Sequence, residues 1–155
     1  QGDEESRKIY FELAKMAKDQ KGGEILSVRE VTEEKLRNAS VMLLGESWKT
    51  PIISKLISNL PKPIDHKEGS FFVKGNRVDE RDESLLLTFP NPLHPGKWMA
   101  IYFGRSASAL SRGRYIFFYG WDSYILFKNG KPIERGNFST VQSFASYDFF
   151  EKKPL

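Results

Sequence analysis

The sequence predicts an α/β fold with a mixed, mainly parallel central sheet flanked by helices in Rossmann-like layers. Three observations predict it. An apolar strand, a glycine-containing loop and a helix follow one another twice, over residues 41–60 and 98–111, which is typical of open parallel sheets. The chain has 155 residues, enough for one domain with its own core. The pair Asn129-Gly130 between two apolar stretches adds an antiparallel hairpin near the C-terminal end.

The composition excludes several classes of protein. Hydrophobic residues make up 39% and charged residues 28% of the chain, so we expect a folded domain and not a disordered segment. The sequence has no cysteine, which excludes disulfides, thiolate metal ligands and a cysteine nucleophile. It also has no run of about 18 apolar residues, so we expect no membrane-spanning helix.

The net charge of +4 is concentrated in the C-terminal part, where residues 97–155 hold nine basic and four acidic residues. The basic residues Arg105, Arg112 and Arg114 flank an aromatic-rich stretch, a combination that can bind nucleic acid. The excess is small for a surface that follows a phosphate backbone. A solvated rim around a buried strand is therefore the favoured interpretation, and nucleic acid is not the expected partner.

The N-terminal segment predicts an amphipathic helix over residues 4–18, which Gly22-Gly23 ends. This helix either packs on the domain or connects it to a preceding one. We therefore separate residues 1–24, as a helix or connector, from a single α/β domain at 25–155. The first residues are Gln1-Gly2 and not Met, which indicates a processed product or a piece of a longer protein.

The first strand–helix unit follows this segment. Weak alternation over Ile25–Val31 predicts a strand, and Thr32 can cap a short helix. The continuous apolar run Val41–Leu44, closed by Gly45, is typical of a strand buried on both faces.

A helix then begins after Thr50, because Pro51 is well suited to its first position. Its apolar stripe extends to Leu60. Residues 64–83 are rich in loops, with a hairpin that turns at Gly75-Asn76.

The C-terminal half predicts more strands. Leu85–Phe89 and Trp98–Phe103 are apolar strands, and a short helix lies near residues 107–111. Tyr115–Trp121 and Tyr124–Lys128 predict aromatic strands. Residues after 139 show no periodicity, but we expect their rings to dock on the domain: Phe144, Tyr147, Phe149 and Phe150.

Two loops are candidate sites for a small anion or a nucleotide. Gly45–Lys49 and Gly104–Ser106 each place glycine and serine before a helix N-terminus, where free N–H groups attract anions. Neither loop has the pattern of a dinucleotide-binding or P-loop motif. The alternative is that Ser106 only caps its helix. The candidate ligand-binding residues are Gly45, Ser47, Thr50, Asn91, Gly104, Arg105 and Ser106.

A serine hydrolase is a further alternative. Gly45-Glu46-Ser47 shares the pattern G-x-S with a nucleophile elbow, and His66 or His94 would be the base. Lys49 stands where the elbow needs a second glycine, so the geometry is unfavourable. The two histidines are 28 positions apart and no H-E-x-x-H pattern is present. We therefore assign no catalytic residue, no metal and no cofactor.

Three stretches together resemble a non-catalytic α/β domain from the C-terminal part of large bacterial peptidase-like proteins, of the prolyl-oligopeptidase-like or metallo-aminopeptidase-like kind. They are Val41–Ile53, similar to a G-x-P-x-x-N-P turn; Leu85–Pro92, which ends in a P-N-P element; and Trp98–Leu110. Thr50 replaces an asparagine of the first motif, and Ser47-Trp48 also departs from it.

The resemblance covers roughly residues 41–137. It implies an accessory domain of a larger exported bacterial protein, with a peptidase as the expected parent. The expected partner is then a neighbouring domain of the same polypeptide. The matching positions imply no catalytic residue.

Overall fold

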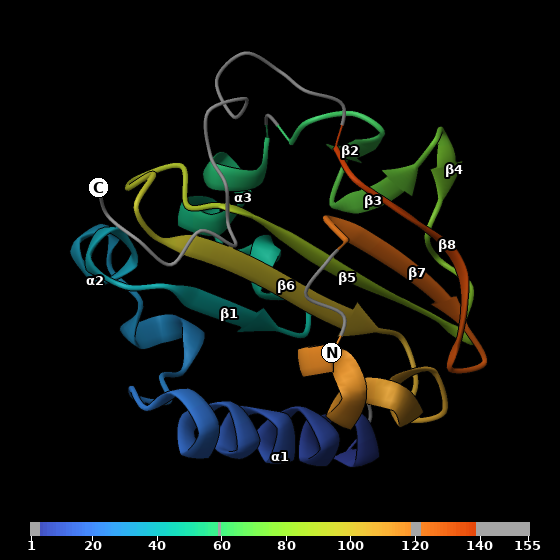
Figure 1. Cartoon of the computed structure of the whole chain (residues 1–155), viewed down its shortest axis with the longest axis horizontal. Helices are drawn as coiled ribbons and strands as arrows, with labels where there is room; N and C mark the ends of the chain where they lie inside the picture. The colour runs from blue at the N-terminus through green and yellow to red at the C-terminus, as the bar shows by residue number, and fades with distance from the viewer. Residues whose placement is uncertain (1–3, 59, 119–121, 139–155) are drawn as a thin grey trace.

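The computed structural model describes residues 4–58, 60–118 and 122–138, and these contain two β-sheets (Figure 1). The larger sheet has five strands in the order β1-β6-β5-β7-β8. Their bounds are β1 (Val41–Leu44), β5 (Glu83–Pro90), β6 (Trp98–Gly104), β7 (Tyr124–Lys128) and β8 (Lys131–Gly136). The smaller, antiparallel sheet consists of β2 (Ile64–Lys67), β3 (Ser70–Val73) and β4 (Asn76–Arg77).

The prediction of a mainly parallel, Rossmann-like sheet flanked by helices is wrong. β1 and β6 are parallel, whereas the other three neighbouring pairs of the larger sheet are antiparallel. Seven residues, 91–97, join β5 to β6, and parallel neighbours need a crossover of about a dozen or more. A backbone hydrogen bond of 3.0 Å from Asn91 N–H to Lys97 O closes this connection as a hairpin.

The second predicted strand–helix unit also differs from the structure. A 3-10 helix, η3 (Ala109–Phe118), follows β6 and leads to β7, which pairs antiparallel with β5. The predicted strand Tyr115–Trp121 is therefore wrong as far as Phe118, and residues 119–121 lie outside the described part. Tertiary packing overrides the strand propensity of this stretch, because Ile116 of η3 is buried in the core cluster that also contains Leu13 of α1.

The larger sheet is covered on both faces (Figure 1). α1 (Glu4–Lys21) and η3 lie on one face, and α3 (Pro51–Ile57) and the smaller sheet lie on the other. The side chains of β5 alternate between the two cores: Leu86 packs with α1 and η3, whereas Leu85 and Leu87 pack with α3 and the smaller sheet. The remaining elements are η1 (Val28–Glu30), α2 (Glu33–Asn38) and η2 (Ser47–Lys49).

Several local predictions are confirmed. Gly22 and Gly23, both with positive φ, follow the end of α1, and Thr32 caps α2 by accepting a hydrogen bond of 3.3 Å from Lys35 N–H. Pro51 begins α3. Asn129 and Gly130, both with positive φ, form the turn between β7 and β8.

Other local predictions are wrong. Ile25–Val31 is not a strand but a loop that contains η1, and α3 ends at Ile57, before Leu60. Ile64–Lys67, expected as a loop, is strand β2. The predicted docking of the aromatic residues after 139 lies outside the described residues.

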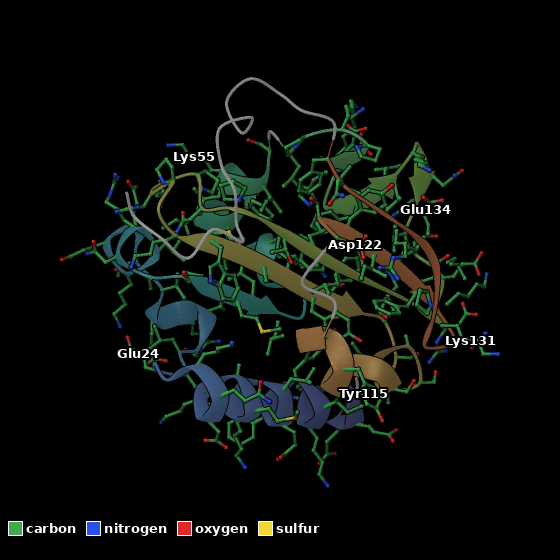
Figure 2. All side chains as sticks on the ribbon, in the orientation of Figure 1. Glu24, Lys55, Tyr115, Asp122, Lys131 and Glu134 are labelled. Atoms are coloured by element: carbon green, nitrogen blue, oxygen red, sulfur yellow. The ribbon has the colours of Figure 1, made fainter. Side chains whose placement is uncertain are left out.

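An ion pair connects the two sheets at the surface. Figure 2 labels Glu134 on β8, and its Oε1 lies 2.8 Å from Lys74 Nζ in the turn between β3 and β4. The Lys74 side chain is 55% exposed, so this pair contributes little to stability. The apolar contacts between the sheets are the larger contribution.

α1 packs directly on the domain through a glycine. Leu13 of α1 is 3% exposed, and a Cβ at Gly113 would lie 2.8 Å from Leu13 Cδ1 and 3.2 Å from Tyr102 Cε1. Gly113 thus allows η3 to approach α1 closely.

We predict that Gly113→Ala destabilises the protein by about 1–3 kcal/mol, because the new methyl group overfills this contact. Urea unfolding followed by circular dichroism measures the loss. In a Leu13→Ala background the same substitution should cost clearly less, because the space for the methyl group is then free. An equal cost in both backgrounds would contradict the proposed contact.

Candidate functional site

The candidate site lies at the carboxyl ends of the parallel strands β1 and β6, where open α/β sheets commonly bind ligands. Gly45 directly follows β1, and Gly104 is the last residue of β6. The strands are parallel, so both glycines lie at the same end of the sheet. The structure thus brings the two predicted loops together, although the sheet around them is not the predicted one.

Tyr10 of α1 occupies this position. Its hydroxyl donates a hydrogen bond of 2.9 Å to Gly104 O and accepts one of 2.8 Å from Gly104 N–H. Its ring lies against Gly45, where an added Cβ would be 3.5 Å from Tyr10 Cε2. The Gly45 N–H donates to Tyr102 O at 3.1 Å. The backbone N–H groups that an anion would need at Gly45 and Gly104 are therefore already used.

The rest of the first loop forms the turn η2. Lys49 N–H donates to Glu46 O at 3.2 Å, and the side chains of Lys49 and Glu46 form an ion pair. Ser47 begins η2, but its side chain lies outside the described part of the structure. Thr50 is the N-cap residue of α3, and its carbonyl accepts a hydrogen bond of 2.9 Å from Ser54 N–H.

In the second loop Ser106 caps η3. This is the alternative role that the sequence analysis gave for Ser106. Ser106 Oγ accepts a hydrogen bond of 3.2 Å from Ala109 N–H and donates one to Arg81 O. The Ser108 hydroxyl lies 3.0 Å from Ser106 Oγ. The side chain of Arg105 is exposed.

Asn91 is not part of this arrangement. It follows β5 at the end where β6 begins, whereas Gly104 lies at the opposite end of β6. Asn91 is 0% exposed, and its Nδ2 donates to Leu36 O at 2.6 Å and to Ala39 O at 3.2 Å. Its Oδ1 accepts a hydrogen bond of 3.0 Å from Leu93 N–H. These bonds hold the loop after β5 against α2, which is a structural role.

An aromatic cluster that our sequence analysis missed lies beneath the first loop. Trp48 of η2 is 3% exposed and lies edge-on against Phe71, at 5.0 Å between ring centroids, and against Phe103, at 4.5 Å. The His66 ring also contacts Phe71, at 4.8 Å between ring centroids and tilted by 52°. Trp48 Nε1 donates to Gly69 O at 3.2 Å. The cluster thus joins the loop after β1 to both sheets; the only sequence signal was the aromatic Trp48 within a polar loop.

Burial acts on the pKa values of three titratable groups around the site. Burial lowers the pKa of His66, whose buried Nε2 makes no hydrogen bond within the described residues. Burial also raises the pKa of Tyr102 to about 12, so this hydroxyl stays protonated at neutral pH. Burial opposes ionisation of Glu46, but Lys49 outweighs it and leaves the pKa of that carboxyl below its ordinary value. His94 Nδ1 accepts a hydrogen bond of 3.0 Å from Gly96 N–H.

The described residues contain neither a metal-binding cluster nor a membrane-spanning helix. Over residues 4–58, 60–118 and 122–138, no group of three histidine, aspartate or glutamate residues is placed to hold a metal ion. In the same ranges, no helix has the length and apolar character required to cross a membrane. No family model, curated protein or solved structure matches the chain. The site is therefore characterised by its own geometry.

We predict that Tyr10→Phe lowers the free energy of unfolding by about 1–2 kcal/mol. The variant keeps the ring against Gly45 but leaves the N–H and C=O of Gly104 without the hydroxyl. Urea unfolding measures the change. Phe11→Ala is the matched control on the exposed face of α1, where Phe11 is 53% exposed, and it should cost less than about 0.5 kcal/mol. Equal effects of the two substitutions would contradict the role of the hydroxyl.

We predict that acid weakens the fold through His66. The folded-state pKa of His66 lies below its ordinary value of 6.5, so the unfolded chain binds this proton more readily. The stability that depends on an uncharged His66 is fully present above pH 6.5 and is lost as the pH falls below that value. In His66→Phe the acid-induced decrease in the free energy of unfolding should be smaller by the contribution of His66. Urea midpoints between about pH 7 and pH 5 measure it. Parallel pH profiles for the variant and the wild type would contradict the prediction.

Proposed function

We propose that the chain is an accessory, non-catalytic domain of a larger exported bacterial protein, with a peptidase as the expected parent. The observation that carries this proposal is the position of Tyr10. At the sheet end where α/β domains commonly hold a ligand, this chain places one of its own side chains and bonds it to the backbone of Gly104. A domain whose function depends on a small ligand there would be expected to leave those groups free.

The sequence resemblance supports the same proposal. It extends over roughly residues 41–137, and all eight strands of the two sheets lie within this range. The motifs that carry it therefore belong to the elements that form the core. In the proteins that it resembles, the domain is an appendage to a hydrolase, so association with a neighbouring domain is the expected role here.

The surface also supports a role in association. Five large apolar side chains are more than a third exposed among the described residues: Phe11, Ile25, Val28, Trp98 and Ile133. Such residues are available to position a neighbouring domain or to complete its fold. The buried candidate Asn91 and the capping residue Ser106, by contrast, are engaged in internal hydrogen bonds.

Binding of a small anion is the second candidate, because the exposed Arg105 adjoins Ser106 at the N-terminal end of η3. The Ser106 hydroxyl already accepts one hydrogen bond and donates another. An anion would have to displace these bonds, which disfavours this candidate.

The size and activity of the native product test the main proposal. An antibody raised against this chain would be used to isolate the product from its source cells, and its intact mass would be measured. We expect a mass well above the 17.9 kDa of this chain, together with peptidase activity in the isolated product and none in the 155-residue chain alone. A native product of 17.9 kDa would overturn the proposal.

Thermal melting of the isolated chain in millimolar phosphate or nucleotide tests the second candidate. We expect no rise in melting temperature. A rise that Arg105→Ala abolishes, and that the exposed control Arg29→Ala retains, would favour anion binding over the accessory role. Hydrolytic activity that Ser47→Ala abolishes would instead favour the serine hydrolase alternative.

A further inference from the structure

Three of the four sheet edges in the described part of the chain carry groups that discourage pairing with another chain. β8 contains Pro132 and charged residues, β2 contains Asp65 and Lys67, and the short β4 ends in Arg77. Charged side chains and proline are common means by which edge strands avoid association. β1 differs, because its sequence is Val-Met-Leu-Leu, without a charge or a proline.

The open edge of β1 presents backbone groups of Met42 and Leu44. β6 is its only neighbour in the sheet as described, and across this pair Gly45 N–H donates to Tyr102 O at 3.1 Å. The direction of backbone groups alternates along a strand, so the N–H and C=O groups of Met42 and Leu44 point away from β6. Both residues are half-buried. Such an edge is a template for one more strand.

One exposed apolar side chain lies beside this edge at the N-terminal end of β1. Trp98 lies beside it, since its N–H donates to Ser40 Oγ at 3.3 Å, and its side chain is 37% exposed. Ile25 and Val28, both 39% exposed, belong to the segment between α1 and α2. That segment also contributes Glu24, labelled in Figure 2, to a groove at α2 whose lining includes Ala39, two residues before β1.

We propose that β1 pairs with β1 of a second copy of this chain, so that the two larger sheets become one across a two-fold axis. The two-fold axis makes the two β1 strands antiparallel. Because the outward N–H and C=O groups belong to Met42 and Leu44, the axis passes at Leu43, midway between them. Met42 of one copy then lies opposite Leu44 of the other, and each such pair exchanges both of its N–H···O bonds. This inference goes beyond the accessory role and does not depend on it.

The properties of β1 favour a second copy as the occupant. A two-fold contact places the same surface on both sides, and like charges directly opposite each other are destabilising. β1 has no charge to oppose itself. Met42 and Leu44 pack with the α1-side core, so their pairing across the axis would continue that core from one copy into the next.

The proposed register also brings acidic and basic residues of the two copies near each other. The register brings Glu46 of one copy to the beginning of the other's β1, next to the basic last turn of α2 with Lys35 and Arg37. Within each copy Glu46 already pairs with Lys49 and Arg37 with Glu33, so this contact adds to existing ion pairs. A four-residue strand pair alone is too small for a stable dimer, which buries about 1,200 Å² or more in total. Trp98, which is 37% exposed and hydrogen-bonded to Ser40 just before β1, supplies additional apolar area.

Light scattering on a sizing column tests the proposal with the full chain. Met42→Pro removes the outward N–H of β1, whereas the matched control Met42→Ala removes the same side chain and keeps the N–H. We expect wild type and Met42→Ala to elute with twice the 17.9 kDa chain mass, and Met42→Pro to elute as a monomer with an unchanged circular dichroism spectrum.

Hydrogen exchange of the wild type keeps the proposal testable if Met42→Pro does not fold. The amides of Met42 and Leu44 should exchange about tenfold faster after dilution from high micromolar to nanomolar concentration, because dissociation exposes them. A monomer at every concentration, or a dimer that Met42→Pro leaves intact, would overturn the proposal. Slow exchange that is independent of concentration would also overturn it, because another part of the chain would then cover β1.

Discussion

Leu85, Leu86 and Leu87 are buried side by side in β5, at 0%, 4% and 0% exposure, so the larger sheet needs apolar cover on both faces. Burial of each such side chain contributes about 1.5–3 kcal/mol. No single layer can provide this, because neighbouring side chains of a strand point to opposite faces. α1 and η3 cover one face, and α3 with the smaller sheet covers the other. The layer order of the molecule follows from this requirement.

The same packing places the residues on which the proposed function rests. When α1 covers its face, Tyr10 reaches the carboxyl ends of β1 and β6 and bonds to Gly104. On the other face, Trp48 anchors the loop after β1 to both sheets. The polar groups at the usual ligand position are therefore used to complete the core. The proposed association role rests on groups at the surface, above all along the uncharged edge of β1.

The candidate site was predictable only in part. Sequence reasoning located the two glycine loops, because a glycine after an apolar strand is a local signal, and the structure brings these loops together. It also associated Asn91 with them, although Asn91 lies at the other end of β6 and bonds to Leu36, 55 positions away in the chain. It did not indicate Tyr10, which is 94 positions from Gly104. Contacts over such separations leave no periodic pattern in the sequence.

The sequence by itself determined the features that depend on neighbouring residues. The strand Val41–Leu44, the helix start at Pro51 and the turn at Asn129-Gly130 each follow from local apolar patterning or from the backbone preferences of proline and glycine. Only the tertiary structure decided how the strands pair. An apolar strand can be buried equally well beside a parallel or an antiparallel neighbour, and here the short 91–97 connection and the cover from α1 and α3 selected the mixed arrangement.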